Sequence, residues 1–368
     1  MKSLIDDALE QHELAKSTQM PLGTPDDEEL AKIVEKLKVS IAIIGCGGGG
    51  SNTINRLSTA GVFGAELVAA NSDAKHLLHV HSPHKILLGR NTTRGLGAGA
   101  LPEVGEKAAQ EAEDELKGYV KGANIVFVTA GMGGGTGTGS APVVARMARE
   151  SGALVIGVVT LPFKAEGKLR MENALRGLER LRTNCDTTAV IPNDKLLELV
   201  PKLPLDAAFR VADEVLMESI KGLTEIITRP GLVNLDFNDV MTIMKNGGVA
   251  MIGMGEANNK TAKGDRIESA VQQALESPLL GDIDLSVARG ALIRVTGGTD
   301  MTVAEAEKAA ELVSARISKS ARIIWGCSVD SSMAGTVRVM TVLTGVKGPS
   351  LMSPKDEPVT KHGVEFVR

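Results

Sequence analysis

Two glycine-rich segments carry the clearest chemical signal in this chain of 368 residues. Residues 45–50 have the spacing G-x-G-x-x-G, and residues 133–139 read Gly-Gly-Gly-Thr-Gly-Thr-Gly. Glycine costs about 0.5–1 kcal/mol per residue in an ordered segment, so such a density needs a compensating use. Backbone N–H groups and hydroxyls at a helix N-terminus bind anions. The pair predicts a di- or triphosphate held between them, and residues 94–100 form a third glycine-rich segment that could close over it.

The first segment alone leaves the nucleotide open. G-x-G-x-x-G is also the dinucleotide fingerprint, which expects a ribose-binding acid at the end of the second strand. Asn71 stands first at that place and Asp73 follows. An NAD-dependent oxidoreductase therefore stays an alternative, as does a glycine-rich turn without a ligand. The oxidoreductase also requires a hydride-transfer group in the second domain, and no His or Cys there is placed as one. The chain has no GxxxxGK[ST] lysine for a P-loop.

Composition excludes several other classes. The chain has 41 Lys+Arg and 45 Asp+Glu, of which 5 and 9 lie in residues 1–38. The basic and acidic residues of the remaining chain are therefore equal in number. A body without basic excess and with only 2% aromatic residues is a poor nucleic-acid binder. No apolar run reaches the roughly 18–20 residues of a membrane span. The acidic N-terminus lacks a signal peptide's apolar centre, and the three separated cysteines fit a reducing cytoplasm.

The elements that must position the glycines are short β-branched runs alternating with helical stretches. Nearly continuous apolar character indicates strands buried on both faces, as in a doubly wound, mainly parallel sheet of the α/β class. These runs are residues 39–44, 67–70, 85–88, 124–129, 154–160 and 188–191. Helices are predicted over 142–150 and 205–227, and the latter leads to a second, smaller α/β domain. That domain has helical stretches over 237–245 and 262–276 and strands over 250–254, 291–296, 323–327 and 337–342.

We therefore predict five parts. They are an N-terminal helical extension (1–38), a nucleotide-binding domain (39–204), a central connecting helix (205–229), a C-terminal α/β domain (230–346) and a flexible tail (347–368). In the extension, Leu30, Ile33, Val34 and Leu37 would form one apolar helix face.

Seven separated motifs resemble the tubulin/FtsZ superfamily and, within it, the FtsZ cell-division GTPases. In chain order they are GCGGGGSN, NSD, GLGAGA, GGGTGTGS, VVTLPF, IPND and the segment 234–239, and the resemblance covers about residues 39–345. It implies a GTP-binding domain joined by a long central helix to a smaller domain. The long acidic extension and the run GCGGGGSNT favour an archaeal member.

The resemblance also assigns roles to residues. The nucleotide would be lined by Gly45, Gly47, Gly48, Gly49, Asn52, Asn71 and Asp73. Ala98, Gly99 and Ala100 would face the γ-phosphate, and Gly133, Gly134, Gly135, Thr136, Gly137, Thr138 and Gly139 the other phosphates. Pro162, Glu166 and Arg170 would lie at the ribose and phosphate, Asn193 and Asp213 would bind guanine, and Phe209 would stack on the base. Read from the residues alone, Phe209 and Asp213 are better interpreted as a core phenylalanine and a solvated acid.

Catalysis is assigned by the same resemblance to Asp236 and Asp239, with Asn234 beside them. They would enter the neighbouring subunit's site and orient the attacking water, so that GTP is hydrolysed at the contact between subunits of a head-to-tail homopolymer. Mg²⁺ would neutralise the phosphate charge, with no ligand assigned among the protein side chains. Without the resemblance the pair is equally a helix N-cap. A polymerising scaffold with vestigial hydrolysis is a third interpretation, and the intact Asp236 and Asp239 argue against it. One departure from the family pattern follows this pair: Val240 and Met241 stand where many members of the family have Arg or Lys.

Two remaining features are weaker. His76, His79, His81 and His84 could indicate a metal site, but their spacing suits no single face, so we expect a solvated connection without metal. The tail ends in the apolar anchor Val364-Glu365-Phe366-Val367-Arg368. By resemblance it would bind a membrane-tethering division adaptor, which would place the protein in the cytoplasm at the division site near midcell, without membrane insertion.

Overall fold

The computed structural model describes residues 39–199, 204–228, 237–259, 264–281 and 283–346. The predicted N-terminal extension and C-terminal tail lie outside these residues, as do Asn234 and Asp236. Among the described helices, none is long and apolar enough to span a membrane.

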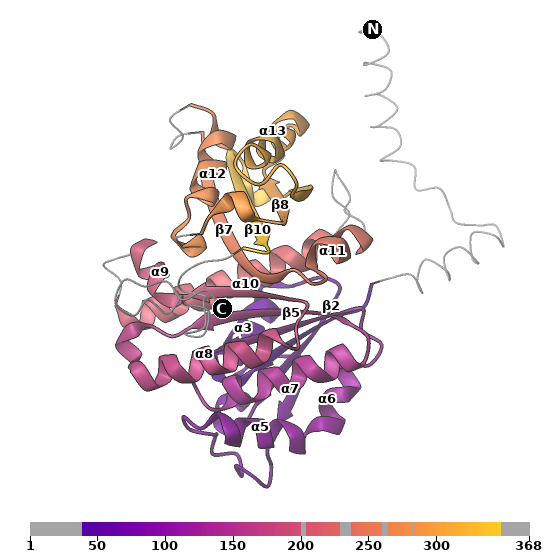
Figure 1. The fold of residues 1–368 in the computed structure, drawn as a ribbon, viewed down its shortest axis with the longest axis vertical. Coiled ribbons are helices and arrows are strands. Elements are labelled where there is room, and N and C mark those ends of the chain that lie inside the picture. The colour runs from indigo at the N-terminus through magenta and orange to yellow at the C-terminus, as the bar shows by residue number, and fades with distance from the viewer. Residues whose placement is uncertain (1–38, 200–203, 229–236, 260–263, 282, 347–368) are drawn as a thin grey trace, which may run out of the picture. The chain divides into compact units, whose positions relative to one another are not determined.

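The described strands form a ten-stranded sheet in the order β3-β2-β1-β4-β5-β6-β7-β10-β8-β9. Neighbours from β3 to β6 are all parallel, as predicted for the first domain. Successive residues of β1 point to opposite faces: Ile41 and Ile43 enter one apolar core, and Ala42 and Ile44 the other. Helices cover both faces, so the sheet is doubly wound (Figure 1). These strands are β1 (Ile41–Cys46), β2 (Ala65–Asn71), β3 (His84–Leu87), β4 (Ile125–Gly131), β5 (Leu154–Leu161) and β6 (Thr187–Pro192).

The helices of this part divide between the two cores. The core on one face receives side chains from α5 (Pro102–Glu111), α6 (Glu113–Val120), α7 (Thr136–Glu150) and α8 (Lys168–Arg182). The core on the other face receives them from α3 (Gly47–Ala60), α4 (Ala74–His79), α9 (Asn193–Leu199), α10 (Leu205–Thr228) and α11 (Phe237–Met244).

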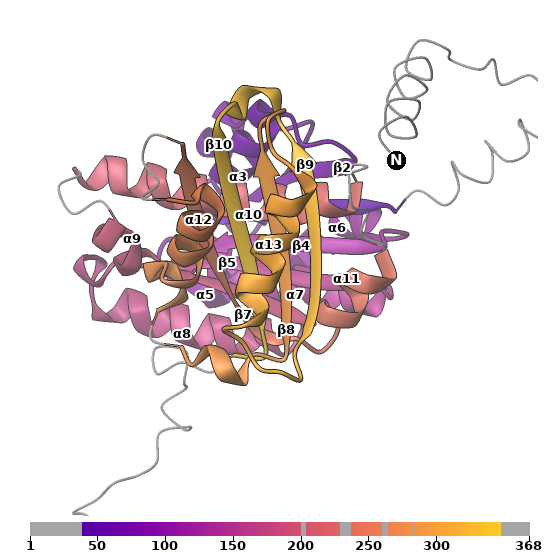
Figure 2. The ribbon, with the colours of Figure 1, turned by 90° about the horizontal axis from the view of Figure 1, so that it is seen from above.

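The second group of strands is mixed. β7 begins with a short parallel pairing to β6, then pairs antiparallel with β10, which is antiparallel to β8; β8 and β9 are parallel. Figure 2 shows α12 and α13 lying over these strands. The second α/β unit is therefore present, while the predicted domain boundaries remain predictions. Its elements are β7 (Gly248–Asn258), α12 (Arg266–Leu275), β8 (Gly290–Gly297), α13 (Val303–Ser314), β9 (Arg322–Val329) and β10 (Thr336–Thr344).

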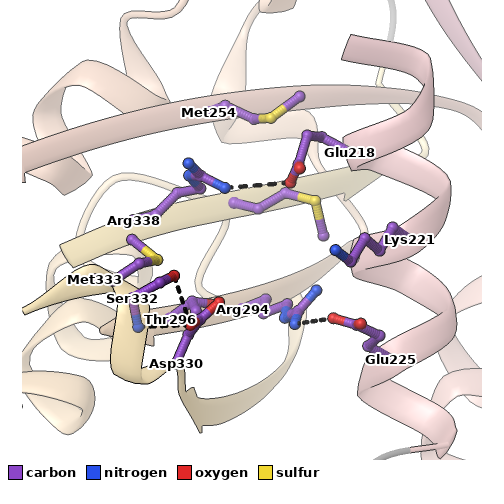
Figure 3. Close-up of a pocket in the computed structure, with 12 residues that line it drawn as sticks. Glu218, Lys221, Glu225, Met254, Arg294, Thr296, Asp330, Ser332, Met333 and Arg338 are labelled. Atoms are coloured by element: carbon purple, nitrogen blue, oxygen red, sulfur yellow. Dashed lines mark hydrogen bonds and ion pairs between the residues drawn. The ribbon is translucent and has the colours of Figure 1, made fainter. Parts of the chain in front are cut away.

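α10 is tied to this second group of strands by ion pairs. Arg294 of β8 contacts Glu225 at 2.6 Å, and Arg338 of β10 contacts Glu218 at 3.2 Å (Figure 3). The two pairs flank a cavity of about 160 Å³. Gly222 lies between them on the helix, where a Cβ atom would be 2.7 Å from the Met340 methyl carbon. The predicted central helix is thus also a packing surface for the second sheet.

Two predicted helix starts were wrong. α7 begins at Thr136 rather than at residue 142, so half of the second glycine segment is the first helical turn. Pro142 is tolerated inside this helix. α12 begins at Arg266 because the Asp265 side chain accepts the N–H of Ile267 and caps it.

Candidate nucleotide site

Both glycine segments lie at the same edge of the sheet. β1 ends at Cys46 and β4 ends at Gly131, and the two strands are parallel neighbours. The strand order reverses between them, because β2 follows on one side and β5 on the other. Ligands of doubly wound sheets bind at this reversal, outside the carboxyl ends of the strands.

Several of the glycines are required by close backbone approach. Gly47 has φ +71°, and a Cβ there would lie 2.6 Å from the Gly137 nitrogen. A Cβ on Gly135 would lie 2.6 Å from the carbonyl oxygen of Gly99. Because glycine has no side chain, the backbone of the second glycine segment can contact the backbones of the first and the third.

Gly48 and Gly134 are different. Among the described residues, and apart from their own neighbours along the chain, no atom lies within 4 Å of the position that a Cβ would take at either residue, and neither has a positive φ. Neither packing nor backbone conformation calls for glycine at these two places. A ligand lying directly against the backbone would call for it.

The two helices that begin at this edge have uncapped N-termini. α3 follows Cys46 and α7 follows Gly135, and neither cap residue makes a side-chain hydrogen bond. Neither helix has an acidic residue in its first turn. The first N–H groups of a helix lack internal partners and carry partial positive charge, so these two starts suit an anion.

The third glycine segment is held against the end of β2 and against the second glycine segment. The Gly97 N–H donates to the Ser72 carbonyl at 3.0 Å, and the Gly135 N–H donates to the Gly99 carbonyl at 2.8 Å. Asn173 of α8 donates to the Ala100 carbonyl at 3.2 Å. Sequence reasoning did not single out Asn173 or Ser72, although the Ser72 hydroxyl lies 2.6 Å from that of Thr136. The residues predicted for the phosphates, which include Ala98, are therefore brought together.

The predicted base-binding residues gather at α10 and the end of β6. The Phe209 ring packs edge-on against Phe163, with centroids 5.0 Å apart at 86°, and is still 37% exposed. Asn193 follows β6 directly and is buried. Its Oδ1 atom has no hydrogen-bond partner among the described residues. An exposed ring and a buried unpaired acceptor are what a base with N–H donors would need.

Asp213 lies one turn after Phe209 on α10. Burial raises its pKa to about 6, while Arg56 and a hydrogen bond from Asn52 lower it, and Glu214 raises it further. Asn52, Arg56, Asp213 and Glu214 line a groove of about 590 Å³ between α3 and α10. The Arg56 guanidinium is paired with Glu214 at 2.7 Å, so it does not neutralise Asp213 directly.

Glu166 and Arg170 form an ion pair at 3.0 Å. Glu166 also accepts the N–H of Phe163 at 2.8 Å, which fixes the turn after β5. Gly133 faces Arg170, since a Cβ at this glycine would lie 2.7 Å from the Arg170 carbonyl oxygen. Pro162, at the start of that turn, is buried. Arg170 thus stands beside the second glycine segment, whereas the Glu166 carboxylate already has protein partners.

The histidine segment is only in part the solvated connection that the spacing predicted, because His79 and His81 are exposed whereas His76 and His84 are half-buried. His76 and His79 belong to α4, and His84 begins β3 and pairs with Glu66 at 3.2 Å. The His76 ring lies between Asn71, at 3.2 Å, and Asn52, at 3.0 Å. Within the described residues, no group of three or more His, Cys, Asp or Glu side chains is placed to hold a metal ion.

Asp239 lies at the other edge of the sheet. It is exposed in the first turn of α11, and the last residue of that helix, Met244, accepts a hydrogen bond from Thr187, where β6 begins. Asn193 marks the opposite end of that strand. A strand of this length spans roughly 20 Å. Asp239 is therefore not brought to the glycine segments of its own chain.

Comparison with known proteins agrees with this arrangement. Residues 40–201 match the "Tubulin/FtsZ family, GTPase domain", and residues 248–347 match the "FtsZ family, C-terminal domain". The chain is 52% identical to "Cell division protein FtsZ 1" of Archaeoglobus fulgidus, over 100% of both chains. It is 51% identical to the namesake from Methanocaldococcus jannaschii, over 88% of each.

Solved structures give the same result. The chain superposes on "FtsZ dimer, empty (M. jannaschii)" with a TM-score of 0.83, covering 88% of this chain and 93% of the other. "CetZ1 from Haloferax volcanii" shares the fold, with a TM-score of 0.73 at 24% identity and coverage of 85% and 96%. The resemblance seen in the seven motifs is confirmed, and the chain belongs to the FtsZ family.

Proposed function

We propose that this protein binds and hydrolyses GTP and polymerises head to tail as the cytoskeletal filament of cell division. The observation that carries the binding step is the pair Gly48 and Gly134, which are glycines where neither packing nor φ requires one. They lie at two uncapped helix starts on the strand-order reversal. A triphosphate lying across both starts would account for all three features.

Guanine is the base that fits the residues expected to bind the base end of the nucleotide. The Asp213 carboxylate can accept the paired N1–H and N2–H donors of guanine, and the Asn193 oxygen can accept a further donor. Adenine presents no such pair of donors. The alternative of an NAD-dependent oxidoreductase is not supported, because the half of the chain that would bind NAD matches a GTPase domain.

Phosphoryl transfer asks a protein mainly for positioning and charge stabilisation. The backbone N–H groups of α3 and α7 would hold the phosphates, and the segment carrying Ala98, Gly99 and Ala100 would face the γ-phosphate. Mg²⁺ would arrive with the nucleotide, bound to its phosphates, and would neutralise part of their charge. No protein side chain is assigned to it.

Hydrolysis would be completed by the next subunit. Asp239 stands at the sheet edge opposite the glycine segments, so head-to-tail stacking brings the Asp239 of one subunit to the nucleotide of the next. Asp236 and Asn234 would act with it to orient the attacking water. A relative of 51% identity is described as a dimer, which supports self-association. GTP hydrolysis should then rise with assembly and weaken the contact afterwards.

The cellular setting follows from the family. The protein would act in the cytoplasm, in a ring at the division site near midcell. We place adaptor binding in the last residues of the tail, where Phe366 supplies an apolar anchor. Deleting residues 361–368 should abolish recruitment to adaptor-coated membranes and leave GTP hydrolysis intact.

A substitution pair tests the binding step. Gly134→Ala should leave thermal stability unchanged and lower GTP affinity at least tenfold, because its methyl group would occupy open space beside the phosphates. Gly118→Ala is the matched control, since Gly118 of α6 is equally open and lies away from the site. It should keep GTP affinity and gain up to about 1 kcal/mol of stability from helix propensity.

The assembly step is tested by sedimentation with GTP, GDP, ATP or NAD. Only GTP should give pelleted polymer together with released phosphate. Equal GTP affinity in Gly134→Ala and Gly118→Ala would contradict the binding site. Pelleting with NAD or ATP would contradict the base assignment.

A further inference from the structure

Four side chains from four elements form a continuous row of hydrogen bonds beside the candidate base site. Asn71 ends β2, His76 lies on α4, Asn52 on α3 and Asp213 on α10. The contacts are Asn71 Nδ2 to His76 Nδ1 at 3.2 Å, His76 Nε2 to Asn52 Oδ1 at 3.0 Å, and Asn52 Nδ2 to Asp213 Oδ2 at 3.5 Å. The imidazole is the central link.

The direction of each bond follows from its neighbours. The Asn71 oxygen accepts the Asp73 N–H at 3.4 Å, so the Asn71 amide nitrogen points at the histidine and donates to it. His76 Nδ1 must then accept, which leaves the imidazole proton on Nε2. That proton is donated to the Asn52 oxygen, and the Asn52 amide nitrogen is left to donate to Asp213. A neutral imidazole with its proton on Nε2 satisfies every contact.

His76 is itself held in place by the backbone. Its N–H donates to the Asp73 carboxylate at 3.0 Å, the N-cap of α4. The other histidines of the segment have different partners: His79 Nδ1 contacts the Lys75 carbonyl, His84 pairs with Glu66, and the His81 N–H donates to Asn55. The row therefore uses one histidine of the four.

We propose that His76 is a positioning residue for base recognition. It would orient Asn52 and Asn71 and, through Asn52, hold the Asp213 carboxylate toward the paired donors of guanine. The inference rests on the proposed function, because Asp213 is taken as the guanine acceptor. The consequence is a contribution of His76 to the preference for GTP over nucleotides that lack one of those donors.

Inosine triphosphate provides the probe, because it lacks the 2-amino group and therefore one donor. His76→Ala removes two hydrogen bonds, so it should raise the dissociation constant of GTP about three- to thirtyfold. The ratio of GTP to inosine triphosphate affinity should fall toward one, and inorganic triphosphate should bind as before. His79→Ala, on the same helix but outside the row, should keep the wild-type ratio.

Two conservative variants separate the two arms of the row. In His76→Gln the amide nitrogen can take the place of Nε2 and donate to Asn52, so the GTP preference should return. In His76→Asn the amide oxygen can replace only Nδ1, so the contact with Asn71 returns and the preference does not. This comparison holds even if the alanine variant folds poorly. Equal ratios in all variants, or recovery in His76→Asn alone, would overturn the proposal.

Nitrogen-15 NMR of the nucleotide-free protein tests the row without any ligand. The His76 ring should show the proton on Nε2, and a proton on Nδ1 would contradict the row. Failure of the wild-type protein to bind GTP would instead defeat the proposed function. A wild-type protein that binds GTP, with a preference that does not depend on residue 76, would defeat this inference alone.

Discussion

Arg294 of β8 and Glu225 of α10 form a buried ion pair at 2.6 Å, with side chains only 13% and 3% exposed. α10 packs its apolar face on the first group of strands and carries Phe209 and Asp213 near its start. β8 belongs to the second group. The pair therefore connects the helix that bears the predicted base contacts to the C-terminal part of the chain.

Breaking this pair should be costly. Arg294→Met would take a cation away from the buried Glu225 carboxylate, and breaking a buried ion pair costs about 3–5 kcal/mol. Urea unfolding without nucleotide should show the loss. The double variant Arg294→Met/Glu225→Met should recover most of it, because it removes both charges and keeps the volume.

Arg338 and Glu218 supply the matched control on the same helix face. Their side chains are 39% and 31% exposed, so water screens the pair and Glu218→Gln should cost about 1 kcal/mol or less. Equal losses for Glu218→Gln and Arg294→Met would contradict the role of burial.

Asp213 should make GTP binding depend on pH. Its pKa of about 6 is raised mainly by burial, so the carboxylate that accepts the guanine donors is lost as the pH falls through 6. GTP affinity should decline between pH 7.5 and pH 5.5. Asp213→Asn should bind GTP at least tenfold more weakly at pH 7.5 and show a flatter profile. The measurement is calorimetric titration, with Glu218→Gln on the same helix as the control. Glu218 lies outside the Asp213 groove and is not among the groups that shift its pKa, so this variant should keep the wild-type profile.

The same pKa has the opposite effect on folding. Because the pKa in the folded state lies above the usual value of 3.8, ionising Asp213 costs stability. Its protonated form contributes stability that is present below pH 4 and is lost as the pH rises through about 6. Asp213→Asn should therefore melt higher than wild type at pH 7.5 without nucleotide. A lower melting temperature would show that the carboxylate is held by favourable partners instead.

Phe209 should contribute to affinity without distinguishing bases. Stacking of an aromatic ring on a base is worth about 1–3 kcal/mol and tolerates every base. Phe209→Ala should weaken GTP and inosine triphosphate by the same factor, because the donors of the base are not involved. Competition binding measures both. A change in their ratio would place Phe209 at the base edge rather than its face.

The location of the candidate site could be predicted from the sequence, because glycine density and the alternation of strands with helices can be read along the chain. The strands between residues 39 and 191 were predicted to within a few residues for the same reason, since buried parallel strands are continuously apolar. The start of α7 could not be predicted this way: glycines normally disfavour helix, and here contact of Gly139 with Pro102 and Glu106 overrides that tendency.

Contacts between segments far apart in the sequence could not be predicted either. His76 was set aside because the four histidines share no face, yet pairing with Asn52 depends on how α3 and α4 pack. Phe163 lies in a recognised motif, but its contact with Phe209 becomes visible only in three dimensions. For α13 a usable signal was present, namely the capping box of Thr302 and Glu305.

Asp239 tests the shared active site. Asp239→Asn should bind GTP normally, because this residue lies at the edge of the sheet opposite its own nucleotide site. Hydrolysis should fall by about 10²–10⁴-fold, the usual cost of removing one positioned catalytic group. Polymers should form and persist, since GTP at the contact is no longer consumed. Thr242→Ala, which is exposed on the same helix, is the control and should hydrolyse at the wild-type rate.

Mixing two inactive variants distinguishes catalysis between subunits from catalysis within one. Gly134→Asp would place a negative charge in the open space beside the phosphates, so it should not hydrolyse GTP while keeping an intact Asp239. In a mixed filament, Asp239 of a Gly134→Asp subunit can meet the GTP bound by an Asp239→Asn subunit. The active site at that contact then has both its GTP and its Asp239. Activity should therefore appear in the mixture and rise with the fraction of mixed contacts, measured by phosphate release once co-polymers are confirmed by sedimentation. If Asp239 acted within its own subunit, neither chain would hold a complete site, and the mixture would release phosphate only at the summed rate of the two variants.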